Sequence, residues 1–318
     1  MQSFKKQLLF LREHKVGILG IKATLLNIYD KKYKTLMIFT FIIFLLAIGI
    51  LIMSYVRTGE FVQKGVTLKG GITLTIQTNE EIDLLAFENK LASELPKADI
   101  SVRKTTELGV IKAIIIEAGD VEEKELLSAV EETGIIKLKE GEYSVESMGS
   151  SLGTQFFKQT IIAVIIAYIA MWLVVLLTFR ELVPSTFVML AATANIICSL
   201  AIVSLIGMKL STAGVAAFLM LIGYASDTNI MLTTKVLRRK EGTVLDRILS
   251  SMKTGMTMTA TTLVAATVAY FFSTSDVIKQ IMIIMIIGLV FDVLNTWVQN
   301  TGILRWYLER KARKAEAK

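Results

Sequence analysis

Two aspartates lie within long apolar stretches of this 318-residue chain, and they are the first candidates for chemistry. Asp227 occurs in LIGYASDTNIMLTTK, and Asp292 occurs in IIGLVFDVLNTWVQN. Burying a carboxylate in a bilayer core is unfavourable, so an acidic residue in such a stretch is a functional candidate by default. A buried Asp227 could carry a proton by alternating between neutral and charged forms, fix packing as an ion-pair partner, or satisfy backbone groups at a helix break. Asp292 could carry a proton or hydrogen-bond a neighbouring helix.

Helical spacing gathers other polar and small residues around both aspartates. Gly223, Asp227 and Met231 share one helix face, and Asp292 shares another with Gly288 and Asn295. These residues predict a polar strip inside a helix bundle, although threonines more often serve helix packing than proton transfer. The candidates for a proton pathway are Asp227, Asp292, Thr228, Asn229, Asn295, Thr257 and Thr261, with Asn195, Ser226 and Thr254 nearby in the pattern.

Several kinds of chemistry are excluded by residue counts. His14 is the single histidine, and Cys198 is the single cysteine and lies in an apolar run. The chain therefore cannot supply a zinc site, a histidine-based relay or a disulfide scaffold. It also contains no nucleotide-binding motif, and we expect no metal, no cofactor and no hydrolytic site. Any proton relay must use carboxylates, hydroxyls and water.

Six apolar stretches are long enough to cross a bilayer, which takes about 20 helical residues. The chain is 53% apolar with a mean hydropathy of +0.58. We therefore expect a polytopic α-helical membrane protein, with a first helix at 35–55 and a five-helix bundle within 151–304. The remaining spans are 159–178, 183–206, 211–233, 256–273 and 280–303.

Basic residues indicate the orientation of these spans. Lysine and arginine gather in residues 1–34, in the 234–255 loop and in the 305–318 tail. The positive-inside rule places both termini and that loop in the cytoplasm, and residues 56–150 outside. The net charge of +7 then reflects topology, and we expect no nucleic-acid partner. Residues 1–34 are too long and basic for a signal peptide, and they form either an interfacial amphipathic helix or a loosely ordered tail.

The acidic segment after the first span reads as a small α+β domain. Residues 57–150 hold 18 of the 28 acidic residues but 11 of the 35 basic ones. Asp120 is a good N-cap for the second helix, and Gly134 should end it. No GK[ST] follows Gly70 and Gly71, so a bulge or close backbone approach is expected there rather than a phosphate loop. The order is βαββαβ, the ferredoxin-like pattern, with strands at 65–77, 98–105 and 109–117, a final strand or hairpin at 135–145, and helices at 80–95 and 121–133.

Four segments resemble, in order and spacing, the motifs of the SecD and SecF family of protein-export membrane proteins. GVTLKGGITLTI resembles the GxDLKGG segment after the first span, and MGSSLGTQF resembles the VGPSLG entry to the second. LIGYASDTNIMLTTKVLRR resembles the fourth-span motif, and SSMKTGMTMTATTL resembles the fifth-span segment. The resemblance covers about residues 35–304 and is greatest to the separate archaeal SecF type. The family motif positions are Gly65, Lys69, Gly70, Gly71, Gly153, Gly223 and Lys235.

The resemblance implies a multi-pass cell-membrane subunit, half of an RND-type transporter, that assists protein translocation. Its partners would be a SecD-like subunit, the SecY channel, unfolded preprotein on the external side and membrane lipid, with the proton motive force driving the work. Two alternatives remain open. An RND-type proton-coupled exporter of lipid or small molecules would be favoured by a large apolar pocket in the external domain. A passive translocon scaffold would be favoured if export does not depend on the charge of Asp227.

The chain also departs from the family pattern. Thr67 stands where the family usually has an acidic residue, and Lys235 stands where it has an arginine. Asp227 aligns with the SecD aspartate but lies one position before the SecF aspartate. The fifth-span arginine of bacterial SecF is replaced by the neighbourhood of Met256 and Met258.

Overall fold

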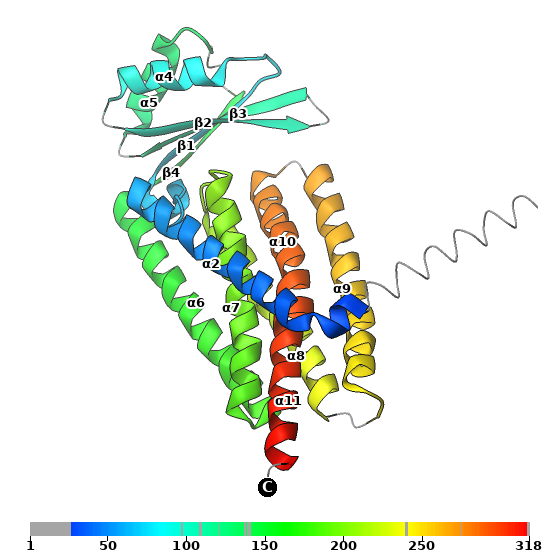
Figure 1. The fold of residues 1–318 in the computed structure, drawn as a ribbon. Helices are drawn as coiled ribbons and strands as arrows, with labels where there is room; N and C mark the ends of the chain where they lie inside the picture. The colour runs from blue at the N-terminus through cyan, green and yellow to red at the C-terminus, as the bar shows by residue number, and fades with distance from the viewer. Residues whose placement is uncertain are drawn as a thin grey trace, which may run out of the picture.

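The computed structural model describes residues 27–316, except 97, 108–109, 120, 137, 139–140, 239–240 and 274. It consists of a bundle of long helices with a small α+β domain at one end (Figure 1). Of residues 1–34, interpreted as an amphipathic helix or a loosely ordered tail, residues 1–26 lie outside the described residues. Asp120, the expected N-cap of the second domain helix, lies outside them too, and the N-cap of that helix is Glu122.

Six helices within the described residues are long and apolar enough to cross a membrane, as expected. The last of them continues without a break, because α10 passes into the π-helix η1 and then into α11 (Figure 1). Their bounds are α2 Tyr33–Thr58, α6 Ser150–Phe179, α7 Leu182–Leu205, α8 Thr212–Arg238, α9 Val244–Phe272, α10 Asp276–Leu294, η1 Asn295–Asn300 and α11 Thr301–Glu316.

Two helices begin well before their apolar segments. Helix α9 starts at Val244 rather than at residue 256 because a capping box fixes its first turn. The Thr243 hydroxyl accepts from the Asp246 N–H at 3.2 Å, and the Asp246 carboxylate accepts from the Thr243 N–H at 3.0 Å. Helix α6 likewise starts at Ser150 rather than at residue 159. Hydropathy locates the membrane-crossing part of a helix, whereas caps locate its ends.

Helices α7 and α8 form the centre of the bundle. In each, 56% of the most apolar window is buried, compared with 6% in α6 and 17% in both α2 and α9. Side chains from α2, α7, α8 and α10 form one apolar cluster that includes Leu51, Cys198, Leu221 and Ile284. The outer faces of α2, α6 and α9 are left for lipid or for another protein.

The α+β domain has the expected ferredoxin-like topology. Its four-stranded antiparallel sheet has the order β2-β3-β1-β4. Helices α4 and α5 cover the sheet face that points away from the bundle (Figure 1), and Phe87, Leu91 and Leu126 pack there against Leu74 and Ile116. The elements are α3 Val66–Lys69, β1 Gly71–Gln77, α4 Leu84–Glu94, β2 Asp99–Glu107, β3 Val110–Gly119, α5 Glu123–Glu132 and β4 Tyr143–Met148.

The start of the domain differs from the expected strand at 65–77. Residues Val66–Lys69 form a single helical turn, and β1 begins only at Gly71. Gly70 and Gly71 have φ values of 88° and 131°, which turn the chain between the two elements. Gly134, with φ at 65°, follows α5 as expected.

Candidate functional site

Asp292 lies at the centre of the bundle and is completely buried. The Thr296 hydroxyl donates to one carboxyl oxygen of Asp292 at 2.9 Å, and the Thr228 hydroxyl of α8 lies beside the same carboxyl group. The other carboxyl oxygen has no hydrogen-bond partner among the described residues. A buried ionised carboxylate without full pairing is strongly unfavourable, so this site suits a group that takes up and releases a proton.

The π-helix η1 directs several polar side chains into the core next to Asp292. Asn295, Gln299 and Asn300 are all buried. Asn300 donates to the Asn229 side-chain oxygen of α8 at 2.6 Å, whereas both amide atoms of Gln299 lack a partner among the described residues. Interruptions of this kind inside α-helices are frequent at functional sites.

Helix α7 contributes further buried polar side chains to the core. Asn195 is buried, and neither of its amide atoms has a partner among the described residues. Ser199 donates to the Asn195 backbone oxygen at 2.7 Å, and Cys198 of the same helix lies beside the Asn295 side chain. Polar groups in such a dry environment need water or a ligand to complete their hydrogen bonds.

The threonines of α9 are placed differently from the expectation. Thr257 and Thr261 are exposed and bond only to carbonyls of their own helix, at 2.9 Å and 3.1 Å. Thr254 is exposed as well. Instead Thr259 is buried and accepts from the Tyr224 hydroxyl of α8 at 3.0 Å. The fifth-span residues predicted to line the polar strip are therefore the wrong ones. The face of α9 that packs against the bundle carries Gly255, Thr259 and Ala266 instead.

Asp227 is also placed differently, since its side chain is exposed in this chain. Its neighbours Ser226 and Thr228 are buried, and so is Asn229. Gly223, one turn before Asp227, is exposed, and a Cβ atom added there would meet nothing within 4 Å. The expectation that Asp227 is buried is wrong for the chain taken alone, because α8 turns the face of Asp227 and Gly223 outward.

The polar core therefore contains Asp292, Thr228, Asn229, Asn295 and Asn195 of the predicted residues, and it omits Asp227, Thr257 and Thr261. Sequence reasoning missed Tyr224, Thr259, Thr296, Gln299 and Asn300. The run NTWVQN at the end of the sixth span was a usable signal, because four of its six side chains are polar. No group of three or more His, Cys, Asp or Glu side chains in the described part of the chain could hold a metal ion.

Comparison with known proteins agrees with this architecture. A family model described as the C-terminal region of the protein-export membrane proteins SecD/SecF matches residues 130–310. The chain is 38% identical to the protein-export membrane protein SecF of Pyrococcus furiosus over 92% of this chain and 96% of the relative. It is 34% identical to SecF of Methanocaldococcus jannaschii, over 84% and 95% of the two chains. The chain belongs to the SecF family.

Two solved structures share the fold of this SecF-family chain. The crystal structure of SecDF from Thermus, described as a translocon-associated membrane protein, matches with a TM-score of 0.70 at 15% identity. SecDF in a super-membrane-facing form matches with a TM-score of 0.59 at 16% identity. The chain is covered to 86% and 90% in these matches, but it spans only 38% and 39% of the SecDF chains.

Two glycines of the family motifs, Gly70 and Gly153, meet where the α+β domain joins the bundle. A Cβ atom on Gly153 would lie 2.7 Å from the Lys69 carbonyl carbon and closer still to the Gly70 nitrogen. A Cβ atom on Gly71 would lie 3.1 Å from the Gly119 Cα atom. The expected close backbone approach is confirmed, and it joins the motif after the first span to the motif that opens the second.

The two motif lysines join neighbouring elements. Lys69 pairs with Asp99 at 3.3 Å and with Glu60 at 3.9 Å. Lys235 donates to the Thr254 hydroxyl at 3.2 Å and to the Ser250 carbonyl at 3.4 Å, so it links α8 to α9 at the end of the bundle away from the domain. A single ammonium group makes both contacts of Lys235, without the paired geometry of a guanidinium.

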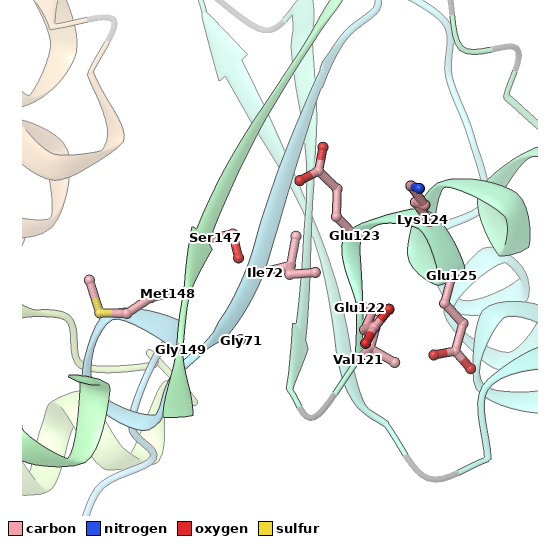
Figure 2. A pocket seen from close by; sticks show the side chains of 10 residues that line it. All are labelled: Gly71, Ile72, Val121, Glu122, Glu123, Lys124, Glu125, Ser147, Met148 and Gly149. Atoms are coloured by element: carbon pink, nitrogen blue, oxygen red, sulfur yellow. The ribbon is translucent and has the colours of Figure 1, made fainter. Parts of the chain in front are cut away.

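The α+β domain carries a groove of about 700 Å³ between the end of β4 and the start of α5 (Figure 2). Charged side chains of α5 and the residues before it stand along one side of it, and Ser147 and Met148 stand on the other. The lining residues are Gly71, Ile72, Val121, Glu122, Glu123, Lys124, Glu125, Ser147, Met148 and Gly149. Polar and apolar surface line this groove in about equal measure, so it is not the large apolar pocket that would favour a lipid exporter.

Proposed function

We propose that the chain is the SecF-type subunit of a SecDF-like complex that assists protein export through the SecY channel. The observation that carries this proposal is the match to SecF of Pyrococcus furiosus along nearly the whole of both chains. In this role the subunit works as a non-enzymatic accessory factor. The experiment is affinity purification of the full chain from native membranes, followed by identification of the proteins that accompany it. Recovery of a SecD-like chain and the SecY channel would support the proposal, and recovery of neither would contradict it.

We propose further that both termini are cytoplasmic and that the α+β domain is external. The basic α8–α9 connection and the basic α11 lie at the end of the bundle opposite the domain (Figure 1), which fits the positive-inside rule. Cysteine introduced at the exposed Glu123 should react with a membrane-impermeant reagent in intact cells, and cysteine at the exposed Glu241 should not. The wild-type chain, whose single cysteine is buried, is the control. The reverse labelling pattern would overturn the orientation.

We propose that the proton motive force acts on the polar core around Asp292. Asp292→Asn keeps the shape and the Thr296 hydrogen bond but cannot titrate, so the variant should fold, insert and retain its partners while losing gradient-driven export. Asp292→Glu should keep partial activity, because the titrating group survives. A structural role predicts the opposite order, with Asn tolerated and the longer Glu worse in a packed site.

Asp227 is the second proton candidate, at the surface of this subunit. The same exchanges, Asp227→Asn and Asp227→Glu, should be measured beside those at Asp292, as export of a secreted reporter with and without a protonophore. Loss of the gradient effect in Asp292→Asn alone would place proton transfer in the core. Loss of the gradient effect in both Asn variants would extend the proton pathway to the exposed face of α8. If neither variant changes export, the chain acts as a passive scaffold.

A further inference from the structure

We infer that the external domain and the outer ends of α6, α7 and α8 form one rigid unit, with Thr67 and the Gly65–Leu210 backbone pair as the joint between the domain and α8. The inference rests on the proposed function, because it assigns the route by which events in the helix core reach the external domain. It also gives the motif GVTLKGG a mechanical role.

Backbone hydrogen bonds form the first part of this joint. The Gly65 N–H donates to the Leu210 carbonyl at 2.9 Å, and the Leu210 N–H donates to the Gln63 carbonyl at 2.7 Å. Lys64 and Leu210 thus form a parallel β-bridge between the segment that enters the domain and the loop that joins α7 to α8. Paired backbone bonds hold two segments in one register, so this contact cannot slide as a side-chain contact can.

Thr67 supplies the second part by capping α8. Its hydroxyl accepts from the N–H of Thr212 at 3.2 Å, and Thr212 is the first residue of α8. The first N–H groups of a helix have no partner within the helix, and side-chain oxygens normally satisfy them. Ser211, directly before α8, caps the Gly214 N–H at 3.3 Å, and Thr67 of the domain supplies a second cap at the Thr212 N–H. The family pattern has an acidic residue at this position. Its carboxylate would also accept from this N–H, and its negative charge would interact favourably with the positive end of the helix dipole.

Further contacts fix the domain to α6 and to the α7–α8 loop. Gly70 lies directly against Gly153 in the first turn of α6, with no room for a side chain between them. The Lys64 ammonium group lies over the Phe157 ring of α6, 4.5 Å from its centroid. The buried Glu117 of β3 pairs with Lys209 of the α7–α8 loop at 3.7 Å.

Beside the joint, the domain is separated from α9. A cleft of about 510 Å³, lined on one side by Gly65 and Thr67 of the joint, extends between the lower face of the sheet and Tyr270 of α9. Helix α10 lies on the fixed side of this cleft, because Gln280 donates to the Lys209 carbonyl of the α7–α8 loop at 2.7 Å and accepts from the Ser211 hydroxyl. Movement of the domain relative to α9 should therefore change the width of this cleft and leave the hydrogen bonds of the joint unchanged.

Helix α8 connects this joint to the polar core. It carries Thr212 at its outer end and Thr228 beside Asp292, 16 residues further along, which is about 24 Å of helix. A tilt or rotation of α8 at the core therefore moves the capped end of α8, and with it the external domain, relative to α9.

Distance measurements on the full chain in nanodiscs test the rigid unit without reference to export. Spin labels would be placed at three exposed positions, Lys124 of α5, Ile206 after α7 and Phe272 at the end of α9. We expect a narrow distribution for Lys124–Ile206 and a broader one for Lys124–Phe272. Equal widths, or a broader Lys124–Ile206 distribution, would overturn the inference even if the export function were established.

Variants of Thr67 test the cap. Thr67→Val removes the acceptor at nearly constant volume and should raise the population with a displaced domain about fivefold, the effect of losing one helix cap. Thr67→Asp should restore the narrow Lys124–Ile206 distribution. Thr75→Val, a matched change on the sheet face of the cleft, should leave it unchanged. A Thr67→Val distribution identical to wild type would remove Thr67 from the joint.

Cross-links then connect the joint to export. A disulfide between Thr67→Cys and Thr212→Cys should leave gradient-driven export within about twofold of the reduced protein, because it locks a contact that does not move. A flexible cross-linker between Thr75→Cys on the sheet and Tyr270→Cys on α9, which both line the cleft, should abolish the gradient-driven part. Loss of export in the first pair, or tolerance of the second, would contradict the inference. A wild-type chain without gradient-driven export would contradict the proposed function alone, and the distance measurements would still decide the joint.

Discussion

Replacing Gly153 by alanine should destabilise the protein, although alanine is the better helix former. Gly153 lies in α6, where alanine is intrinsically preferred over glycine by about 1 kcal/mol. The added Cβ atom, however, would lie 2.7 Å from the Lys69 carbonyl carbon and 3.0 Å from the Gly70 Cα atom. Ordinary contacts of a Cβ atom begin near 3.4 Å, so the two segments must separate by roughly 0.7 Å or more.

The size of the effect follows from what has to move. All three atoms nearest to the new Cβ belong to the backbone, so no side chain can rotate away to relieve the overlap. Overpacking of this kind typically costs about 1–3 kcal/mol, and a rigid backbone contact belongs at the upper end. Subtracting the gain in helix propensity leaves a net loss of roughly 2 kcal/mol. A loss of this size lowers the melting temperature of a 318-residue chain by about 3 °C.

The assay is thermal unfolding of the purified chain in detergent, together with protease cleavage at the junction between the domain and α6. The matched control is Gly49→Ala in α2, another helical glycine, where the added Cβ atom would meet nothing within 4 Å. Gly49→Ala should melt at or slightly above the wild-type temperature. If Gly153→Ala also melts at or above the wild-type temperature, Gly153 and Gly70 are not in close backbone contact.

Two other exchanges test the outward face of α8 and the end of α8 away from the α+β domain. Gly223→Val should leave the melting temperature of the isolated chain within about 2 °C of wild type, because its side chain meets no neighbour in this chain. It should nevertheless reduce the amount of SecD-like partner recovered on purification, and unchanged recovery would argue against an interface at this face. Lys235→Met removes two exposed hydrogen bonds to α9 and should cost about 1 kcal/mol in the same melting assay, whereas a much larger loss would show that Lys235 has a role beyond this link.

The helices and the domain topology could be predicted because their signals are local. Apolar length marks a membrane span, and β-branched alternation, turn residues and helix stops mark the ferredoxin-like order. The ends of the elements were less predictable because caps and glycines set them. The capping box at Thr243 starts α9 twelve residues before its predicted span, and Gly70 and Gly71 turn residues Val66–Lys69 out of the predicted strand.

The candidate site was only partly predictable, because a membrane helix is apolar on all sides. Asp292 and Asn295 were expected in one polar group, and both are buried. Asp227 was expected to be buried on the same grounds, yet hydropathy does not distinguish the face of α8 that packs inside from the face that points outward. Gln299 and Asn300 were missed because the i→i+5 turn of η1, which brings them into the core, follows no simple helical spacing.

The exposed position of Asp227 predicts that a second protein covers this face of α8 in the membrane. Asp227 lies 15 residues into α8, about 22 Å from its outer end, and thus deep within a bilayer whose apolar core is about 30 Å thick. A carboxylate facing lipid at that depth costs about 2.5–3.5 kcal/mol even on the most permissive scale, and Asp227 is exposed among the described residues. The adjacent Gly223 leaves room for a second helix to approach closely, as small residues do at helix contacts in membranes. The same face therefore presents both a need for a polar partner and the space for one, which is what a subunit requires if it pairs with a second six-helix bundle through α8.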